Sequence, residues 1–130
     1  MKLLLDTHIF LWYISGDHHL PKDLKDIIQD SMNEVFLSVV SLWESIVKYR
    51  LGKLLLPMSP EKYLPLQRER HDISSLSLDE AEIIHLSDLP SFHRDPFDRM
   101  LICQALEHNM TIVTMDAAIA QYPIKILPKS

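Results

Sequence analysis

Short apolar runs separated by longer helical segments constrain this chain more than any other feature. Lys2–Leu5, Val35–Ser38 and Thr111–Thr114 are four residues each, a length typical of buried strands. The segments between such runs have the periodicity and the end signals of amphipathic helices. Strands that alternate with helices predict an α/β fold whose central parallel sheet is covered on both faces.

Residues that begin and end helices mark the segments between the strands. Asp95–Asn109 is the clearest predicted helix, because Asp95 is a good N-cap and Pro96 suits the first helical position. Serine followed three residues later by glutamate predicts capping boxes at Ser41 and Ser77, which open helices to about Leu51 and Leu86. The other expected elements are an apolar segment at His8–Ser15, helices at Pro21–Ser31, Pro60–Arg70 and Ala117–Gln121, and strands at Ile73–Leu76 and Ile124–Ile126.

The length and the charge of the chain limit its organisation and its partners. A chain of 130 residues is long enough to bury one core, and residues 1–130 are expected to form a single domain. The formal net charge of −5 argues mildly against nucleic-acid binding through a basic surface. Two bound divalent cations would cancel most of this charge, so it does not exclude a polyanionic substrate.

The sequence predicts a cytoplasmic protein without a membrane anchor. Cys103 is the only cysteine, so it cannot form an internal disulfide, and a reducing compartment fits best. Asp6 and His8 interrupt the apolar N-terminus before it resembles a signal peptide. No apolar run approaches the roughly 20 residues that a membrane-spanning helix needs.

Four acidic residues follow short apolar runs or lie near the start of predicted helices, and they are Asp6, Glu44, Asp98 and Asp116. The carboxyl ends of parallel strands meet at one edge of a sheet, where open α/β folds bind ligands. Carboxylates that converge without basic partners repel one another, and a hard divalent cation relieves that repulsion through oxygen ligands. The pattern predicts a metal-dependent enzyme that acts on phosphates.

Each of these acids also has a purely structural interpretation. Asp6 and Asp116 can cap the helices that follow them. Glu44 occupies the glutamate position of a predicted capping box, and Asp98 lies where a helix dipole favours negative charge. The metal site is favoured because all four are expected at the same edge of one sheet. Other chemistries lack support, since two glycines cannot build a phosphate loop and zinc spacing and a nucleophile elbow are absent.

The motifs around these acids resemble those of PIN domains, and of VapC-type toxins, the ribonuclease halves of bacterial toxin–antitoxin pairs. The segments, in the family's order across nearly the whole chain, are Leu3–His8, Ser41–Glu44, Asp95–Met100 and Val113–Asp116. The resemblance implies a three-layer α/β/α sandwich with a central parallel sheet. It also implies Mg²⁺ or Mn²⁺ at the acidic cluster, cleavage of RNA, an antitoxin partner and a homodimer.

The resemblance assigns roles residue by residue. The positions that match the family's catalytic, metal-binding acids are Asp6, Glu44, Asp98 and Asp116. Asp95 is an extra acid of the third motif, which either supports the site or caps the helix. Thr114 matches a hydroxyl-bearing position suited to a hydrogen bond with a carboxylate. His8 stands where many family members have asparagine, so the contacts there are expected to differ.

Basic and aromatic residues near the motifs have two interpretations each. Arg99 is the best candidate for a contact with the RNA backbone because it neighbours Asp98, although a solvated helix surface is the commoner role. Aromatic residues are expected either in the core or in a groove for an antitoxin peptide or a second copy, and they are Phe10, Trp12, Tyr13 and Trp43.

Several functions remain open from the sequence. The leading one is the toxin of a VapBC-type module, a Mg²⁺-dependent endoribonuclease that hydrolyses RNA phosphodiesters with metal-activated water. Alternatives are a PIN-domain nuclease of RNA maturation, a small phosphatase with the same site, and a degenerate PIN binding module without activity. The presence of all four acids argues against the last.

Overall fold

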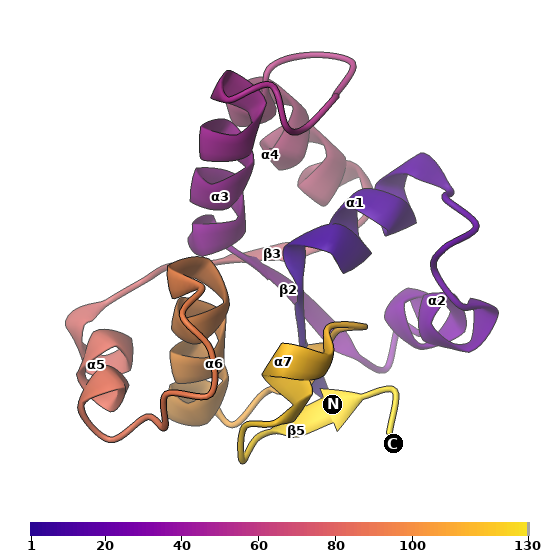
Figure 1. The fold of residues 1–130 in the computed structure, drawn as a ribbon. Helices are drawn as coiled ribbons and strands as arrows, with labels where there is room; N and C mark the ends of the chain where they lie inside the picture. The colour runs from indigo at the N-terminus through magenta and orange to yellow at the C-terminus, as the bar shows by residue number, and fades with distance from the viewer. Residues whose placement is uncertain (130) are drawn as a thin grey trace.

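Five parallel strands form one sheet in the computed structural model, which describes residues 1–129 (Figure 1). The strands are β1 (Lys2–Leu5), β2 (Glu34–Ser38), β3 (Ser74–Leu76), β4 (Thr111–Val113) and β5 (Lys125–Leu127). They lie in the order β3-β2-β1-β4-β5, so β1 is central. All neighbouring pairs are parallel, which confirms the predicted α/β class.

Helices connect the strands. They are α1 (Thr7–Ser15), α2 (Lys22–Gln29), α3 (Val39–Arg50), α4 (Pro60–Arg70), α5 (Glu80–Ile83), the 3-10 helix η1 (Ile84–Ser87), α6 (Pro96–His108) and α7 (Ala117–Ala120). Within residues 1–129, none of them is both long enough and apolar enough to cross a membrane.

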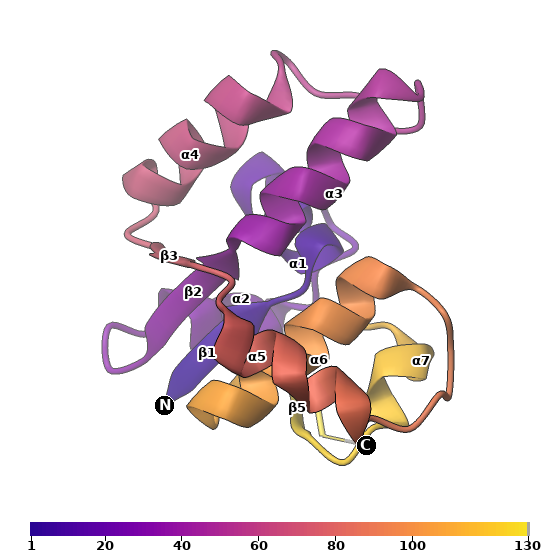
Figure 2. The same cartoon turned by 90° about the vertical axis from the view of Figure 1, so that its left-hand side faces the viewer.

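Side chains that alternate along the strands divide the core into two clusters. Leu4 of β1 and Ile112 of β4 belong to a cluster with residues of α6 and α7. Leu3 and Leu5 belong to the other cluster, with residues of α1, α2 and α4. Figures 1 and 2 show the same division, with α5 and α6 on one side of the sheet and α1 and α2 on the other. The chain therefore forms the predicted three-layer α/β/α sandwich.

The aromatic residues that the sequence left undecided differ in burial. Phe10 is fully buried between α1 and the sheet, whereas Trp12 and Tyr13 are only partly buried against the same cluster. Trp43 is 50% exposed and packs edge-to-face on Phe97, with ring centroids 4.7 Å apart. Only Phe10 is thus a core residue in the strict sense.

The predicted ends of α6 are confirmed. Asp95 Oδ1 accepts hydrogen bonds from the backbone N–H groups of Phe97 at 2.9 Å and Asp98 at 3.1 Å, so Asp95 is the N-cap. Asn109 ends the helix in the left-handed conformation with φ 53°, which asparagine tolerates well. Leu106, which the predicted apolar stripe included, is 37% exposed, so the buried stripe ends one residue earlier.

Both predicted capping boxes are wrong in position. β2 runs directly into α3, and the hydroxyl of Ser38 caps that helix by accepting from the Val40 N–H at 3.0 Å. Ser41 therefore lies inside α3. The box that opens α5 is formed by Asp79 and Glu82, two residues beyond the predicted serine. The serine–glutamate spacing alone did not reveal where each strand or loop ends.

Candidate active site

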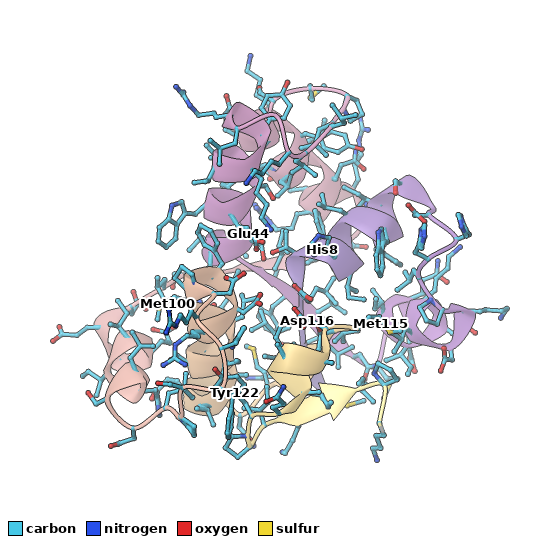
Figure 3. All side chains as sticks on the ribbon, in the orientation of Figure 1. His8, Glu44, Met100, Met115, Asp116 and Tyr122 are labelled. Atoms are coloured by element: carbon cyan, nitrogen blue, oxygen red, sulfur yellow. The ribbon has the colours of Figure 1, made fainter. Side chains whose placement is uncertain are left out.

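The topology brings the four predicted acids to the carboxyl edge of the sheet. Asp6 directly follows the central strand β1, and Asp116 follows β4 as the N-cap of α7. Because β1 lies between β2 and β4, Asp6 occupies the switch point at which open α/β sheets bind ligands. Glu44 lies on α3 and Asp98 in the first turn of α6. Figure 3 shows Glu44 and Asp116 on either side of the start of α1.

The pKa of Asp98 reflects both its burial and the presence of other carboxylates around it. Burial raises this pKa most, and repulsion from neighbouring carboxylates raises it further, to about 8. These neighbours are, in decreasing order of effect, Asp95, Asp6, Asp116 and Glu44. Distant carboxylates in water would not perturb one another in this way. The structure thus brings the four acids together, and their catalytic role stays a prediction.

Thr114 holds the carboxylate of Asp6. Its hydroxyl donates to Asp6 Oδ2 at 2.7 Å and accepts from the backbone N–H of Asp116 at 3.0 Å. Burial raises the pKa of Asp6, and the hydrogen bond from Thr114 opposes this rise. Although Asp6 is the N-cap residue of α1, its side chain makes no capping hydrogen bond. The predicted bond between Thr114 and a carboxylate is confirmed, and the capping interpretation of the Asp6 side chain is wrong.

Glu44 is held by protein donors on both oxygens. Thr7 Oγ1 donates to Oε1 at 2.7 Å, and Lys48 Nζ donates to Oε2. Burial lowers the pKa of Lys48, but the hydrogen bond and the charge of Glu44, with Asp95 and Asp98 beyond it, raise the pKa overall. Lys48 lies four residues after Glu44, a spacing that predicts a helical ion pair. A metal ion at Glu44 would have to share or displace this pair.

A network behind Asp98 joins the loop before α6 to Tyr122, the second residue after α7. His93 Nε2 lies 3.2 Å from Asp98 Oδ2, and its Nδ1 lies 2.8 Å from the hydroxyl of Tyr122. Arg99 Nη1 donates to the same hydroxyl at 2.9 Å and to the carbonyl oxygen of Pro90 at 2.8 Å. Tyr122 is only 3% exposed. The network therefore fixes the loop and orients Asp98 from behind.

The guanidinium group of Arg99 is engaged within this network. The sequence suggested that its guanidinium contacts the RNA backbone, but the structure engages it with Tyr122 and backbone carbonyl groups. Contact with substrate would require some of these bonds to break, so that role stays a prediction. No local pattern pointed to Tyr122, whereas the nearness of His93 to the third motif was visible in the sequence.

Asp95 and Asp116 do cap helices. Asp95 caps α6 through Oδ1 alone. Asp116, which is exposed, accepts from the backbone N–H of Ala118 at 2.8 Å, also through Oδ1. Each has a second carboxylate oxygen that takes no part in these capping bonds, so capping and a contribution to a cation site are compatible.

The donor set fits a hard divalent cation. A cation would offset the repulsion between carboxylates that contributes to the raised pKa of Asp98. It could also bind the carboxylate of Asp6, which makes no capping hydrogen bond to α1. Among residues 1–129, three candidate ligand atoms lie within 4.8 Å of one another only at Asp17, His18 and His19, on the loop after α1. The four acids thus form an open group instead of a closed cage. This suits Mg²⁺, which uses few protein ligands and keeps several waters.

Replacement of Thr114 by valine is expected to destabilise the fold by about 1–3 kcal/mol. Loss of the hydroxyl leaves the backbone N–H of Asp116 without its acceptor and removes the hydrogen bond that lowers the pKa of Asp6. Urea unfolding of Thr114→Val and Thr111→Val at pH 7 measures the effect. Thr111 is a matched control, because it is a buried threonine of β4, which ends just before Thr114, and its hydroxyl makes no side-chain hydrogen bond within residues 1–129. Equal losses of unfolding free energy in the two variants would show that the hydrogen bonds of the Thr114 hydroxyl contribute nothing to stability.

Known proteins share parts of this sequence. The family model described as PIN domain matches residues 3–125. Over 63 residues the chain is 40% identical to "Ribonuclease VapC16" of Mycobacterium tuberculosis. This match covers 48% of the chain and 45% of that protein, which is less than half the length of the relative.

Solved structures share the fold. The crystal structure of VapBC2 from Rickettsia felis bound to a DNA fragment from their promoter aligns with a TM-score of 0.72 and 16% identity, covering 97% of each chain. DNA-bound VapBC from Salmonella typhimurium aligns with a TM-score of 0.68 and 21% identity, covering 97% of this chain and 96% of that one. At these identities the likeness concerns the fold.

Proposed function

This chain belongs to the PIN domain family, and we propose that it is a metal-dependent endoribonuclease, the toxin of a VapBC-type toxin–antitoxin pair. The observation that carries the proposal is the group of acids at the carboxyl edge of the sheet, where burial and, after it, repulsion from the other carboxylates raise the pKa of Asp98 to about 8. The name of the ribonuclease relative supports RNA as the substrate. The names of the structural neighbours support a toxin of the VapBC class.

The proposed site would hold Mg²⁺ or Mn²⁺ through Asp6, Asp98 and Asp116. Such an ion would act as a Lewis acid that makes a water a better nucleophile toward a phosphodiester. Thr114 and His93 orient the two buried carboxylates, Asp6 and Asp98, from behind. Glu44 already pairs with Lys48 and is therefore less available to the ion than the other three acids.

Lys48 has a second role in the proposal. Its ammonium group lies near enough to Asp95 and Asp98 to be stabilised by their charges. The formal net charge of the chain is −5, so an RNA phosphate approaching the acids is repelled unless positive charge lies beside them. Lys48 supplies such charge on the α3 side of the site and favours the approach of the substrate.

The proposed partner is an antitoxin protein. The support is that the similar structures are named as VapBC complexes. A homodimer stays a prediction from the family resemblance.

Induced expression of the chain in a bacterium is expected to arrest growth and to create new RNA ends, because the toxin would cleave cellular RNA. Asp6→Asn should abolish both effects, whereas Asp23→Asn, an exposed acid on α2, should keep them. Removal of divalent cations by a chelator should likewise stop cleavage by the purified protein, and added Mg²⁺ should restore it. Growth arrest and RNA cleavage by Asp6→Asn equal to those of the wild type would refute the proposal.

A further inference from the structure

A hollow of about 250 Å³ opens directly beside the acids. It is lined by Asp6, His8, Ile9, Trp12, Met115 and Asp116. The lining therefore includes two of the proposed metal ligands, and the other lining residues are aromatic or apolar. Figure 3 shows His8 at the start of α1, with Asp116 and Met115 below it. Met115 is 51% exposed, so this surface is not part of the packed core.

Trp12 borders three hollows on this surface. It lines this hollow and two others, one of about 500 Å³ toward α2 and one of about 230 Å³ toward Leu54–Leu56. Its ring centroid lies 6.2 Å from that of His8, one turn earlier on α1. His19 stacks on Trp12 at 5.6 Å with an interplanar angle of 26°. His8, Trp12 and His19 form an aromatic row that leads from the acids toward the loop after α1.

We infer that this hollow and the aromatic row bind the unpaired bases of single-stranded RNA next to the phosphate that is cleaved, an inference that rests on the proposed function. Unstacked bases are held by aromatic side chains, and such stacking tolerates any sequence. The hollow is smaller than the roughly 300–1,000 Å³ of typical small-molecule pockets, and its size suits one planar base. The flexible thioether of Met115 adapts to bases of different shape.

Because the protein carries a net negative charge, its affinity for RNA needs a source other than charge, and base stacking is such a source. An acidic chain with carboxylates at its site gains little from a general basic surface. Stacking on rings supplies affinity that does not depend on charge. It also selects against duplex RNA, because the base faces in a duplex are already stacked on one another.

Fluorescence can test the contact directly, because Trp12 and Trp43 are the only tryptophans. The protein used carries Trp43→Phe, which leaves Trp12 as the reporter, and Asp98→Asn, which keeps the RNA intact. A short single-stranded RNA of mixed sequence should quench Trp12 fluorescence in a saturable way. A ribose-phosphate chain of the same length without bases, and the same RNA annealed to its complement, should quench far less. Equal quenching by all three would overturn the inference.

Cleavage kinetics give the second readout. Trp12→Ala should raise KM for single-stranded RNA about tenfold, with kcat within about twofold, because stacking is made in the ground state as well. Trp12→Phe should restore most of the affinity, since a smaller ring still stacks. Unchanged KM in Trp12→Ala with an active wild-type enzyme would overturn the inference, even if the same variant bound the partner protein less tightly. A wild-type protein that cleaves no RNA would refute the proposed function instead, whatever the quenching experiment shows.

Discussion

Asp98→Asn is expected to abolish RNA cleavage and, in protein prepared without divalent cations, to raise the melting temperature. The amide keeps the shape of the carboxylate and can still form a hydrogen bond with His93, but it carries no charge. Burial, and after it repulsion from the other acids, raises the pKa of Asp98 to about 8, so at neutral pH the fold must either protonate this group or tolerate its buried charge. Removal of the charge relieves that cost and stabilises the fold. Cleavage falls at least about a hundredfold, because the carboxylate no longer contributes to electrostatic stabilisation at the site.

Calorimetric melting at pH 7.5 and cleavage assays on the same preparations measure the two effects together. The melting temperature should rise by several degrees, since about 1 kcal/mol shifts it by a few degrees in a domain of this size. Asp23→Asn on the surface of α2 is the control. It should keep full cleavage and should not raise the melting temperature, because Asp23 lies in the first turn of its helix, where negative charge is favourable. An Asp98→Asn protein that is less stable than the wild type would mean that burial and the neighbouring carboxylates do not disfavour the charge of Asp98. Retained cleavage would remove Asp98 from the site.

The affinity for Mg²⁺ should rise by up to about tenfold per pH unit as the pH approaches 8, and then level off. Asp98 must lose a proton before it can bind a cation, and its pKa of about 8 makes proton release part of binding below that pH. The same shift predicts how stability depends on pH without divalent cations. Because the pKa in the folded state lies above the unfolded value of 3.8, folding takes up a proton between these values. The contribution of Asp98 to stability therefore falls as the pH rises from about 4 to 8.

Isothermal titration of Mg²⁺ at pH 6, 7, 8 and 9, in two buffers of different ionisation enthalpy, is the appropriate measurement. The wild type should release close to one proton per bound ion at pH 6 and almost none at pH 9. Asp98→Asn should show weaker binding with little proton release throughout. Identical affinity from pH 6 to 9 in the wild type would contradict the assignment of the raised pKa to a cation-binding carboxylate.

Local signals explain what the sequence could predict. The strand at Lys2–Leu5 and the helix that Asp95 caps depend on neighbouring residues, and both appear with nearly the predicted bounds. The convergence of Asp6, Asp98 and Asp116 also follows from local facts, because each of them lies at the end of a strand or the start of a helix. Glu44 lies in the second turn of α3, and it reaches the site because β2 runs directly into that helix. Parallel pairing then places these ends at one edge.

Contacts between distant segments explain what the sequence could not predict. Tyr122 lies 29 residues from His93 and 23 from Arg99, and nothing in the spacing of these residues shows that they meet. The three meet only because α6 and α7 pack on the same face of the sheet. The pairing of Glu44 with Lys48 differs, because its helical spacing was visible and only the burial of Glu44 gave it importance.

The most direct test is a crystal structure of the protein soaked in Mn²⁺, with the ion located by its anomalous scattering. The ion should appear at the carboxyl edge of the sheet, at coordination distance from the carboxylates of Asp6 and Asp98, and it should be lost in Asp6→Asn. A peak only at the exposed Asp17–His18–His19 loop, or no peak beside Asp6 at saturating Mn²⁺, would contradict a cation-binding site built from these acids.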